Sequence, residues 1–310
     1  MRGKVLTKFI FAASVVMLLA ITNVFAQIRK PVAKPIASRS LTILTEPKAI
    51  IWLDNIRRGV TGETGSFKIN KVAAGSHSLR VRAVGFAEKT TTVSAAQRGE
   101  IKIALVKTTD EAELAFQQAE ETRESARDKT KAVELYRRAL ELRPDYAEAH
   151  VGLARLFETS NPDEALAHIE KAREIRPNYA EASTVEGRIH RESLDTENAI
   201  KSFRRALREA KNIQPEAHTG LALTYRDNGD YENAATEFKT AIVQLADSDP
   251  AIYRLLAEMY EKMQRKPDAI AVYEKFLQIA PDDVYASGVR SIIEQLKKQD
   301  SGETLDLMPQ

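Results

Sequence analysis

Hydrophobic residues follow two different periods along this chain. Between residues 41 and 107, short β-branched and aliphatic runs alternate with turn residues, and a period of two is clearest at 79–83 and 101–105. From about residue 110 to 298, apolar residues instead recur with helical spacing. The pattern predicts about six short strands, as in a small β-sandwich, followed by an all-α segment.

The helical segment repeats itself. Alanines recur at intervals of 33, 34, 35 and 35 residues, at Ala132, Ala165, Ala199, Ala234 and Ala269. A large apolar residue follows each alanine by four positions and a mostly small residue follows by seven, so all three lie on one helical face. The phrases "RPDYAEA" at 143–149 and "RPNYAEA" at 176–182 fall at the junction between successive units. Such a period predicts stacked helical pairs.

Helix ends are marked within this period. Pro144, Pro177 and Pro281 follow the second helix of three units, and proline ends a helix because it lacks the N–H and clashes with the preceding turn. Lys211 and Ala246 occupy the corresponding place in the other two units. After Pro281, apolar residues between 289 and 296 share one face, which predicts the capping helix that a solenoid needs.

These features resemble the tetratricopeptide repeat (TPR) family over five units, from about 113 to 282. A second small-and-large pair in the first helix of each unit, such as Ala222 with Tyr225, agrees with that resemblance. The first unit departs from it, because Glu120 and Arg123 stand where a small residue and an aromatic residue are usual. Together with the predicted strands, this resemblance predicts a multidomain α and β protein, in which a small β-sandwich precedes a TPR solenoid of about five repeats at 108–298.

The predicted β-sandwich at 41–107 resembles the PEGA domain, a small module of exported bacterial proteins. The resemblance rests on "TILTEPKAIIWLDN", on Ala74-Gly75 before "HSLRV", and on the Gly85-Phe86 corner. Lys48 stands where that family has glycine. The rhythm of "GSFKI" and "AAGSHSLRV" is also similar to carboxypeptidase-regulatory-like domains, so both families remain open.

Residues 1–26 have the pattern of a signal peptide. Basic residues precede an apolar run, and Val24 and Ala26 occupy the positions expected before a cleavage site at Gln27. The protein is therefore expected to be exported, either periplasmic or secreted. The alternative is a membrane anchor at residues 9–26, which hold no charge over a length that suits a membrane span. Residues 27–40 are expected to form a basic, proline-containing linker, and 299–310 a disordered tail.

Composition adds a charge asymmetry between the two halves. Residues 27–107 hold 15 basic and 5 acidic residues, a net charge of +10, whereas 108–310 hold 28 and 39, a net charge of −11. The chain has no cysteine, so disulfides and thiol chemistry are excluded.

Motifs of catalysis are absent from the sequence. It has no HExxH, GxSxG, P-loop or GxGxxG motif. His150, His190 and His218 occupy packing positions of the repeat and are interpreted as structural. We therefore expect a protein that is not an enzyme, with no cofactor and no metal site.

Nucleic acid is not an expected partner. The β-region is basic, but only Trp52, Phe67 and Phe86 are available there for base stacking, and their spacing suggests core positions. A membrane is expected as a partner only if residues 1–26 are not cleaved.

The TPR resemblance indicates where a partner would bind. In that family the concave surface is lined by positions two, five, nine and twelve of each first helix. These positions hold Arg155, Arg188, Arg191, Arg226 and Arg254, with Glu148, Glu181 and Glu216 at their edge. Two interpretations are open: the arginines are solvated or paired with those glutamates, or they form a groove for an extended, acidic peptide.

Two functions are consistent with these features. The first is an exported, non-enzymatic scaffold whose concave TPR face binds a protein or peptide partner. The alternative is a module that binds a cell-envelope or surface polymer through the basic β-domain, with the TPR arm as a spacer.

Overall fold

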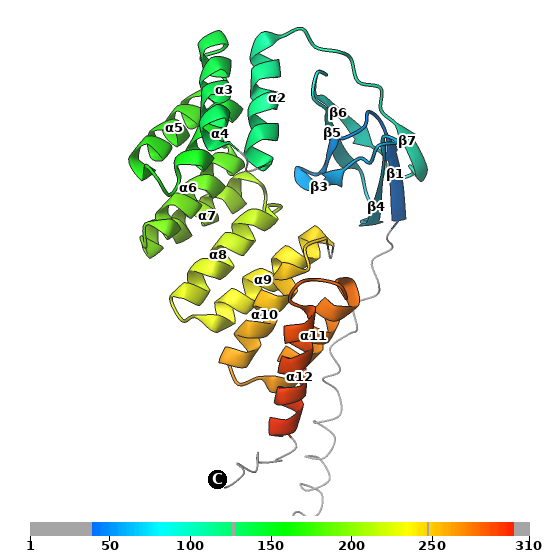
Figure 1. Ribbon diagram of the computed structural model, residues 1–310, viewed down its shortest axis with the longest axis vertical. Coiled ribbons are helices and arrows are strands. Elements are labelled where there is room, and N and C mark those ends of the chain that lie inside the picture. Colours follow the sequence, from blue (N-terminus) through cyan, green and yellow to red (C-terminus); the bar gives the residue numbers. More distant parts are fainter. Residues whose placement is uncertain (1–38, 126–127, 247, 301–310) are drawn as a thin grey trace, which may run out of the picture. The chain divides into compact units, whose positions relative to one another are not determined.

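The computed structural model describes residues 39–125, 128–246 and 248–300 (Figure 1). The predicted signal peptide, nearly all of the linker and most of the tail lie outside these residues. The described part holds seven strands, β1 to β7, and then eleven helices, α2 to α12. A small β-domain is therefore followed by a helical solenoid, as the two hydrophobic periods predict.

The β-domain consists of two sheets. One has the strand order β4-β1-β7, with β1 parallel to β7, and the other is antiparallel with the order β3-β2-β5-β6. The strands are β1 Arg39–Leu44, β2 Ile50–Leu53, β3 Ile56–Val60, β4 Ser66–Val72, β5 His77–Arg82, β6 Lys89–Val93 and β7 Gly99–Lys102.

Alternating side chains of both sheets form the core of this domain. Leu79 and Val81 are fully buried and Ala83 nearly so, which confirms the alternation predicted for this strand. Ile103 is likewise buried, with Ile101 packed against the same cluster.

One boundary and one strand of the β-domain differ from the prediction. Strand β1 begins at Arg39, inside the predicted linker, because the Arg39 guanidinium donates to the carbonyl oxygens of Gly75 and Ser94 and so belongs to the domain. Strand β3 follows a tight turn in which Asp54 and Asn55 both have positive φ. Its sequence, IRRGV, lacks the apolar run by which the other strands were recognised.

Trp52 does not lie in the core, contrary to the prediction. It stands on the outer face of its sheet, with the guanidinium carbon of Arg80 at 4.2 Å and that of Arg82 at 5.2 Å from its ring centre. Glu88 forms ion pairs with both arginines. The alternation of β2 explains this placement, because Ile51 and Leu53 take the inward positions on either side of Trp52.

The helices form antiparallel pairs, followed by a single last helix (Figure 1). The pairs are α2 Glu111–Glu124 with α3 Lys129–Leu142, α4 Ala147–Phe157 with α5 Pro162–Ile175, α6 Ala180–Glu192 with α7 Thr196–Glu209, α8 Pro215–Asp227 with α9 Tyr231–Leu245, and α10 Ala251–Lys262 with α11 Lys266–Ile279. First helices of neighbouring pairs also touch: α2 with α4, α4 with α6, and α6 with α8.

The repeated positions form the core of the solenoid, as predicted. All five alanines of the period are fully buried, and the large residue that follows each of them is at most 1% exposed. Glycines allow close approach to these rings: a Cβ at Gly187 would lie 2.6 Å from Phe203, and one at Gly220 would lie 2.3 Å from the same ring. Phe203 is therefore enclosed by helices α6 and α8.

Helix ends follow the prolines where prolines are present. Helices α3, α5 and α11 each end two residues before a proline. Where Lys211 and Ala246 replace it, the chain instead turns through left-handed conformations, with φ of 51° at Lys211 and 53° at Ala246. Left-handed residues end a helix by redirecting the backbone, so the period continues without proline.

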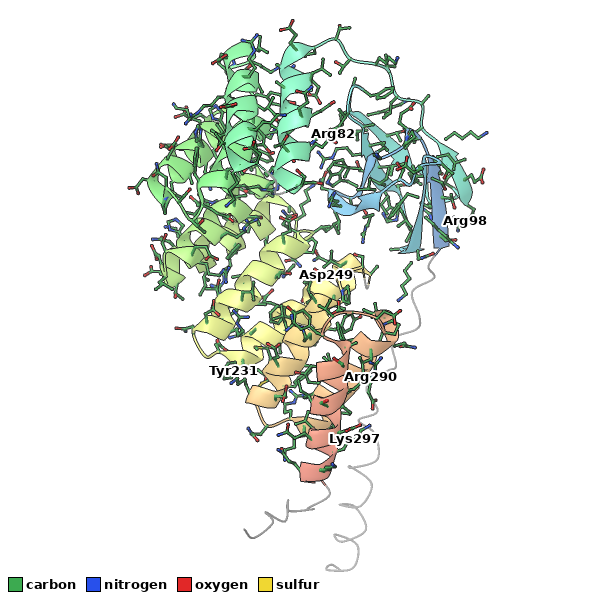
Figure 2. The ribbon with its side chains drawn as sticks, in the orientation of Figure 1. Arg82, Arg98, Tyr231, Asp249, Arg290 and Lys297 are labelled. Atoms are coloured by element: carbon green, nitrogen blue, oxygen red, sulfur yellow. The ribbon has the colours of Figure 1, made fainter. Side chains whose placement is uncertain are left out.

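The last helix, α12 Ala286–Asp300, caps the solenoid as predicted. Val289, Ile293 and Leu296 are buried against the last repeat. Lys297, labelled in Figure 2, forms an ion pair of 2.8 Å with Glu274 of α11. None of the helices within the described ranges is long and apolar enough to cross a membrane.

The first pair, α2 with α3, is regular despite its unusual sequence. Its polar residues find partners inside the fold: the Glu120 carboxylate accepts from the Arg123 guanidinium and from the Tyr136 hydroxyl. One turn earlier in α2, the buried Gln117 side chain accepts from the Gly85 backbone N–H and donates to the Phe86 carbonyl. Helix α2 therefore joins the β-domain to the repeats.

Candidate functional site

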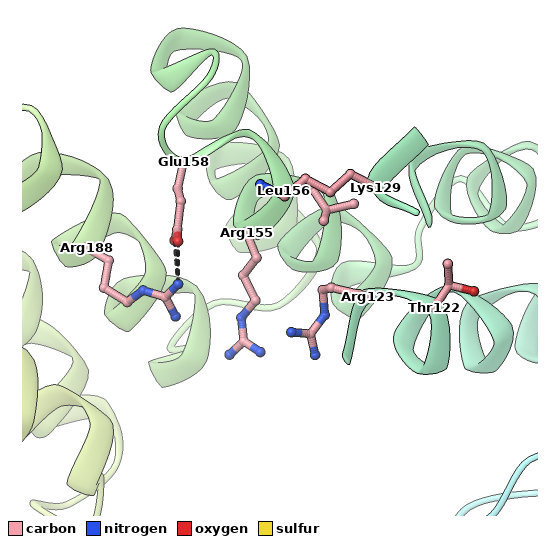
Figure 3. A pocket seen from close by; sticks show the side chains of 7 residues that line it. All are labelled: Thr122, Arg123, Lys129, Arg155, Leu156, Glu158 and Arg188. Atoms are coloured by element: carbon pink, nitrogen blue, oxygen red, sulfur yellow. Dashed lines mark hydrogen bonds and ion pairs between the residues drawn. The ribbon is translucent and has the colours of Figure 1, made fainter. Parts of the chain in front are cut away.

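A cavity of about 230 Å³ lies on the first helices of the N-terminal repeats (Figure 3). Three guanidinium groups lie side by side in it, from helices α2, α4 and α6. The lining residues are Thr122, Arg123, Lys129, Arg155, Leu156, Glu158 and Arg188. Four of these seven side chains are cationic and one is acidic, and further carboxylates, those of Glu120 and Glu181, contact two of the arginines.

The repeat itself places two of these arginines. Arg155 follows the buried Ala154 of α4, and Arg188 follows the buried Gly187 of α6, at the equivalent position one repeat later. Both side chains line the same cavity. The predicted pair is therefore brought together in one site.

Arg155 is the most enclosed of the three arginines. Its side chain is 16% exposed, and its Nη2 lies 2.8 Å from Glu181 and 3.8 Å from Glu216. Desolvation acts to lower the pKa of this guanidinium, but the carboxylates of Glu181, Glu216 and Glu120 raise it by more, and the net pKa lies above its ordinary value. Arg155 thus keeps its charge inside the cavity. Pairing with Glu181 and Glu216 agrees with the first interpretation of the arginines.

Arg188 is held from the neighbouring repeat. Its Nη2 donates to both carboxylate oxygens of Glu158, each at 2.6 Å, and Glu158 is the C-terminal cap residue of α4. The pair is partly exposed, at 36% for Arg188 and 20% for Glu158. This contact fixes the guanidinium at the mouth of the cavity instead of leaving it free in solvent.

Arg123 completes the row, and sequence reasoning missed it. Its Nη2 donates to Glu120 at 3.0 Å and its Nε to the Tyr136 hydroxyl at 3.2 Å. Burial acts to lower its pKa, whereas Glu120 raises it by more, so Arg123 also remains charged. The available signal was the departure itself: an arginine at a position where the family has an aromatic residue.

The remaining predicted arginines lie outside this cavity. Arg191 and Arg226 share the carboxylate of Asp227, at 3.4 Å and 2.7 Å. Arg254 pairs with Glu258 at 3.0 Å and stacks over the ring of Tyr285 at 4.3 Å. The five predicted residues therefore form three separate groups within the described residues.

The histidines make contacts within the repeat. His150 and His168 join helices α4 and α5, with their Nδ1 atoms 2.9 Å apart. His218 contacts Glu237 of α9 at 2.6 Å. No cluster of three or more side chains that would hold a metal ion occurs within the described ranges.

Solved structures with a similar fold were found for the solenoid. A thermophilic TPR protein of Thermus thermophilus, TTC0263, is 23% identical over 60% of this chain and 98% of its own, with a TM-score of 0.50. Pseudomonas aeruginosa PilF is 18% identical over 62% of this chain and 93% of its own, with a TM-score of 0.50. Yeast Tom70 is 16% identical over 62% of this chain and 41% of its own, with a TM-score of 0.54. At these identities, the likeness shows the fold alone.

Family models support the same assignment. No curated protein matches the sequence. The family model described as Tetratricopeptide repeat matches four overlapping segments, 121–180, 155–212, 184–250 and 219–284. Together they span residues 121–284, which is more than half of the 310-residue chain. The chain therefore belongs to the tetratricopeptide repeat family, whose fold is a scaffold for protein interactions.

Proposed function

We propose that this protein is an exported, non-enzymatic scaffold, and that its solenoid binds an acidic segment of a protein partner in the cavity of Arg123, Arg155 and Arg188. The observation that carries this proposal is the row of three charged guanidiniums in one cavity (Figure 3). Each guanidinium has five N–H donors, and the internal carboxylates occupy only some of them. Donors that remain exposed can bind a carboxylate ligand, whereas Nε of Arg155 is itself buried.

Electrostatic cost also favours an acidic ligand. The three cations repel one another: burial and, in addition, the charge of Arg155 act to lower the pKa of Arg123, although Glu120 offsets both effects. A carboxylate that enters the cavity reduces this repulsion and forms charge-assisted hydrogen bonds, which are stronger than neutral ones. A neutral peptide of the same shape lacks both contributions.

The test uses calorimetric titration with a capped oligo-aspartate peptide, and oligo-asparagine serves as the neutral control. The variant Arg188→Gln with Glu158→Gln removes one guanidinium while leaving the net charge unchanged. Its matched control is Arg137→Gln with Glu164→Gln, an ion pair of 3.5 Å between the second helices α3 and α5. We expect oligo-aspartate to bind the parent and the control equally, and the cavity variant at least about tenfold more weakly, the loss of one charge-assisted bond.

Salt provides an independent check on the same titration. The affinity should fall as the Debye length shrinks from about 10 Å at 0.1 M to about 3 Å at 1 M salt. Equal affinity of the parent and the cavity variant would refute the site and would favour the alternative, in which the basic β-domain binds an envelope polymer.

Export has its own test. The charged, apolar and small-residue segments of 1–26 support cleavage before Gln27. N-terminal sequencing of the protein from the periplasm or medium should begin at Gln27. An intact Met1 in the membrane fraction would establish the anchor instead, and residues 27–40 would then lie beside the bilayer.

A further inference from the structure

Each arginine of the cavity already has an internal carboxylate partner at 3.0 Å or less. The pairs are Arg123 with Glu120, Arg155 with Glu181, and Arg188 with Glu158. An ion pair attracts a distant ligand less than a single charge does, because the fields of its two members largely cancel. The long-range attraction that the arginine row exerts on an anion is therefore small.

Two further carboxylates approach the same row. Glu124 lies 3.9 Å from Arg123, although it is closer to Arg57, at 3.0 Å. Glu216 lies 3.8 Å from Arg155. The arginines therefore supply hydrogen-bond donors in fixed directions, but little positive charge in excess of the carboxylates around them.

The fourth cation of the cavity, Lys129, is different. It is the first residue of α3, its side chain is exposed, and it lines the cavity (Figure 3). Its ammonium group forms no ion pair and no hydrogen bond with any other residue that the structure describes. The adjacent carboxylate of Asp128 instead accepts from the backbone N–H of Lys131. Lys129 is therefore the cavity cation whose charge no ion pair offsets.

We propose that Lys129 determines the preference of the cavity for an acidic ligand, and that the three arginines orient the bound carboxylate. This inference rests on the proposed function, because it concerns the ligand of the same cavity. A lysine side chain is flexible and ends in a compact charge, so its ammonium group can move to meet a carboxylate. A ligand that pairs with Lys129 also leaves the internal ion pairs of the arginines in place.

The test compares two lysines of the same helix. Lys129 and Lys131 are both exposed on the first turn of α3, but only Lys129 lines the cavity. Residues two positions apart on a helix do not face each other. The variants Lys129→Gln and Lys131→Gln each remove one positive charge, so any effect of net charge is the same in both. Affinity for the capped oligo-aspartate peptide is measured by calorimetric titration of the full chain, with oligo-asparagine as the neutral peptide.

We expect Lys129→Gln to bind oligo-aspartate at least about fivefold more weakly than the parent, and Lys131→Gln to bind it within about twofold of the parent. Lys129→Arg should keep most of the affinity, because it keeps a positive charge at the same position. The affinity of Lys129→Gln should also fall less steeply with added salt than that of the parent, since one attractive charge is missing.

Equal affinity of the two glutamine variants would overturn the inference. So would binding of Lys129→Arg as weak as that of Lys129→Gln. Either result leaves the proposed function intact if the parent binds oligo-aspartate more tightly than oligo-asparagine. If the parent binds the two peptides equally, both proposals fail.

Discussion

Replacing Gly220 by alanine tests the packing that holds successive repeats together. In an open helix this change stabilises by about 0.8–1 kcal/mol, because glycine is the poorer helix former. A Cβ at Gly220, however, would lie 2.3 Å from both Cε1 and Cζ of Phe203. The Phe203 ring has little space to move away, because Gly187 is also packed against it: a Cβ at Gly187 would lie 2.6 Å from the same ring.

Overpacking of this kind costs about 1–3 kcal/mol in the free energy of unfolding. Because the Phe203 ring is enclosed, we expect the cost of Gly220→Ala to lie at the upper end of this range. After the gain in helix propensity, we expect a net loss of roughly 2 kcal/mol in the free energy of unfolding. Gly288→Ala on α12 is the matched control, since nothing lies within 4 Å of its added Cβ. This control should stabilise by about 0.5–1 kcal/mol.

Urea denaturation followed by circular dichroism measures both variants. The two midpoints should shift in opposite directions with an unchanged m-value, which marks a change in stability alone. Adding Phe203→Leu to Gly220→Ala should recover part of the loss, because the smaller side chain makes room for the methyl group. If Gly220→Ala is stabilising like Gly288→Ala, the stacking of α6, α7 and α8 around this ring is wrong.

Two further predictions concern partly buried ionisable groups. Burial acts to raise the pKa of Glu186, but hydrogen bonds from Arg173 and the charges of Arg173 and Arg205 lower it by more. Glu186→Gln should therefore destabilise by roughly 1–3 kcal/mol at pH 7, and its deficit in urea midpoint should shrink as the pH falls below about 4.5 towards the folded pKa. Desolvation lowers the pKa values of His150 and His168. The unfolded chain then binds more protons than the folded chain, so the parent should lose stability as the pH falls through about 6.5. The double variant His150→Gln with His168→Gln should lose less stability over the same pH range. Identical profiles of melting temperature against pH in the parent and the variant would contradict this.

Most of the fold could be predicted from the sequence because its hydrophobic and small residues recur at regular intervals. An alanine such as Ala199 is buried at the same place in every repeat, and several residues in register exclude chance agreement. The repeated "RPxYAEA" phrase has a local reason as well. Arg143 and Arg176 stack over Tyr146 and Tyr179 at 4.5 Å in both copies, so one junction is used twice.

The site was less readable because it depends on contacts between repeats. Position within the repeat predicts that Arg155 and Arg226 face one surface, but it does not say which carboxylate each will meet. Arg226 forms an ion pair with Asp227 at the C-terminal end of the same helix, α8, whereas Arg155 forms an ion pair with Glu181 in the cavity. Strand β3 was missed for a similar reason, since it is defined by pairing with β2 and not by its own hydrophobicity.

Nuclear magnetic resonance of arginine Nε–H groups tests the central claim most directly. During titration with the capped oligo-aspartate peptide, signals of Arg123, Arg155 and Arg188 should shift with one common dissociation constant. Signals of Arg137 and Arg138, which lie exposed on α3, should stay unchanged. Binding that shifts only arginines of the β-domain, or shifts exposed and cavity arginines alike, would contradict the assignment of the cavity as the binding site.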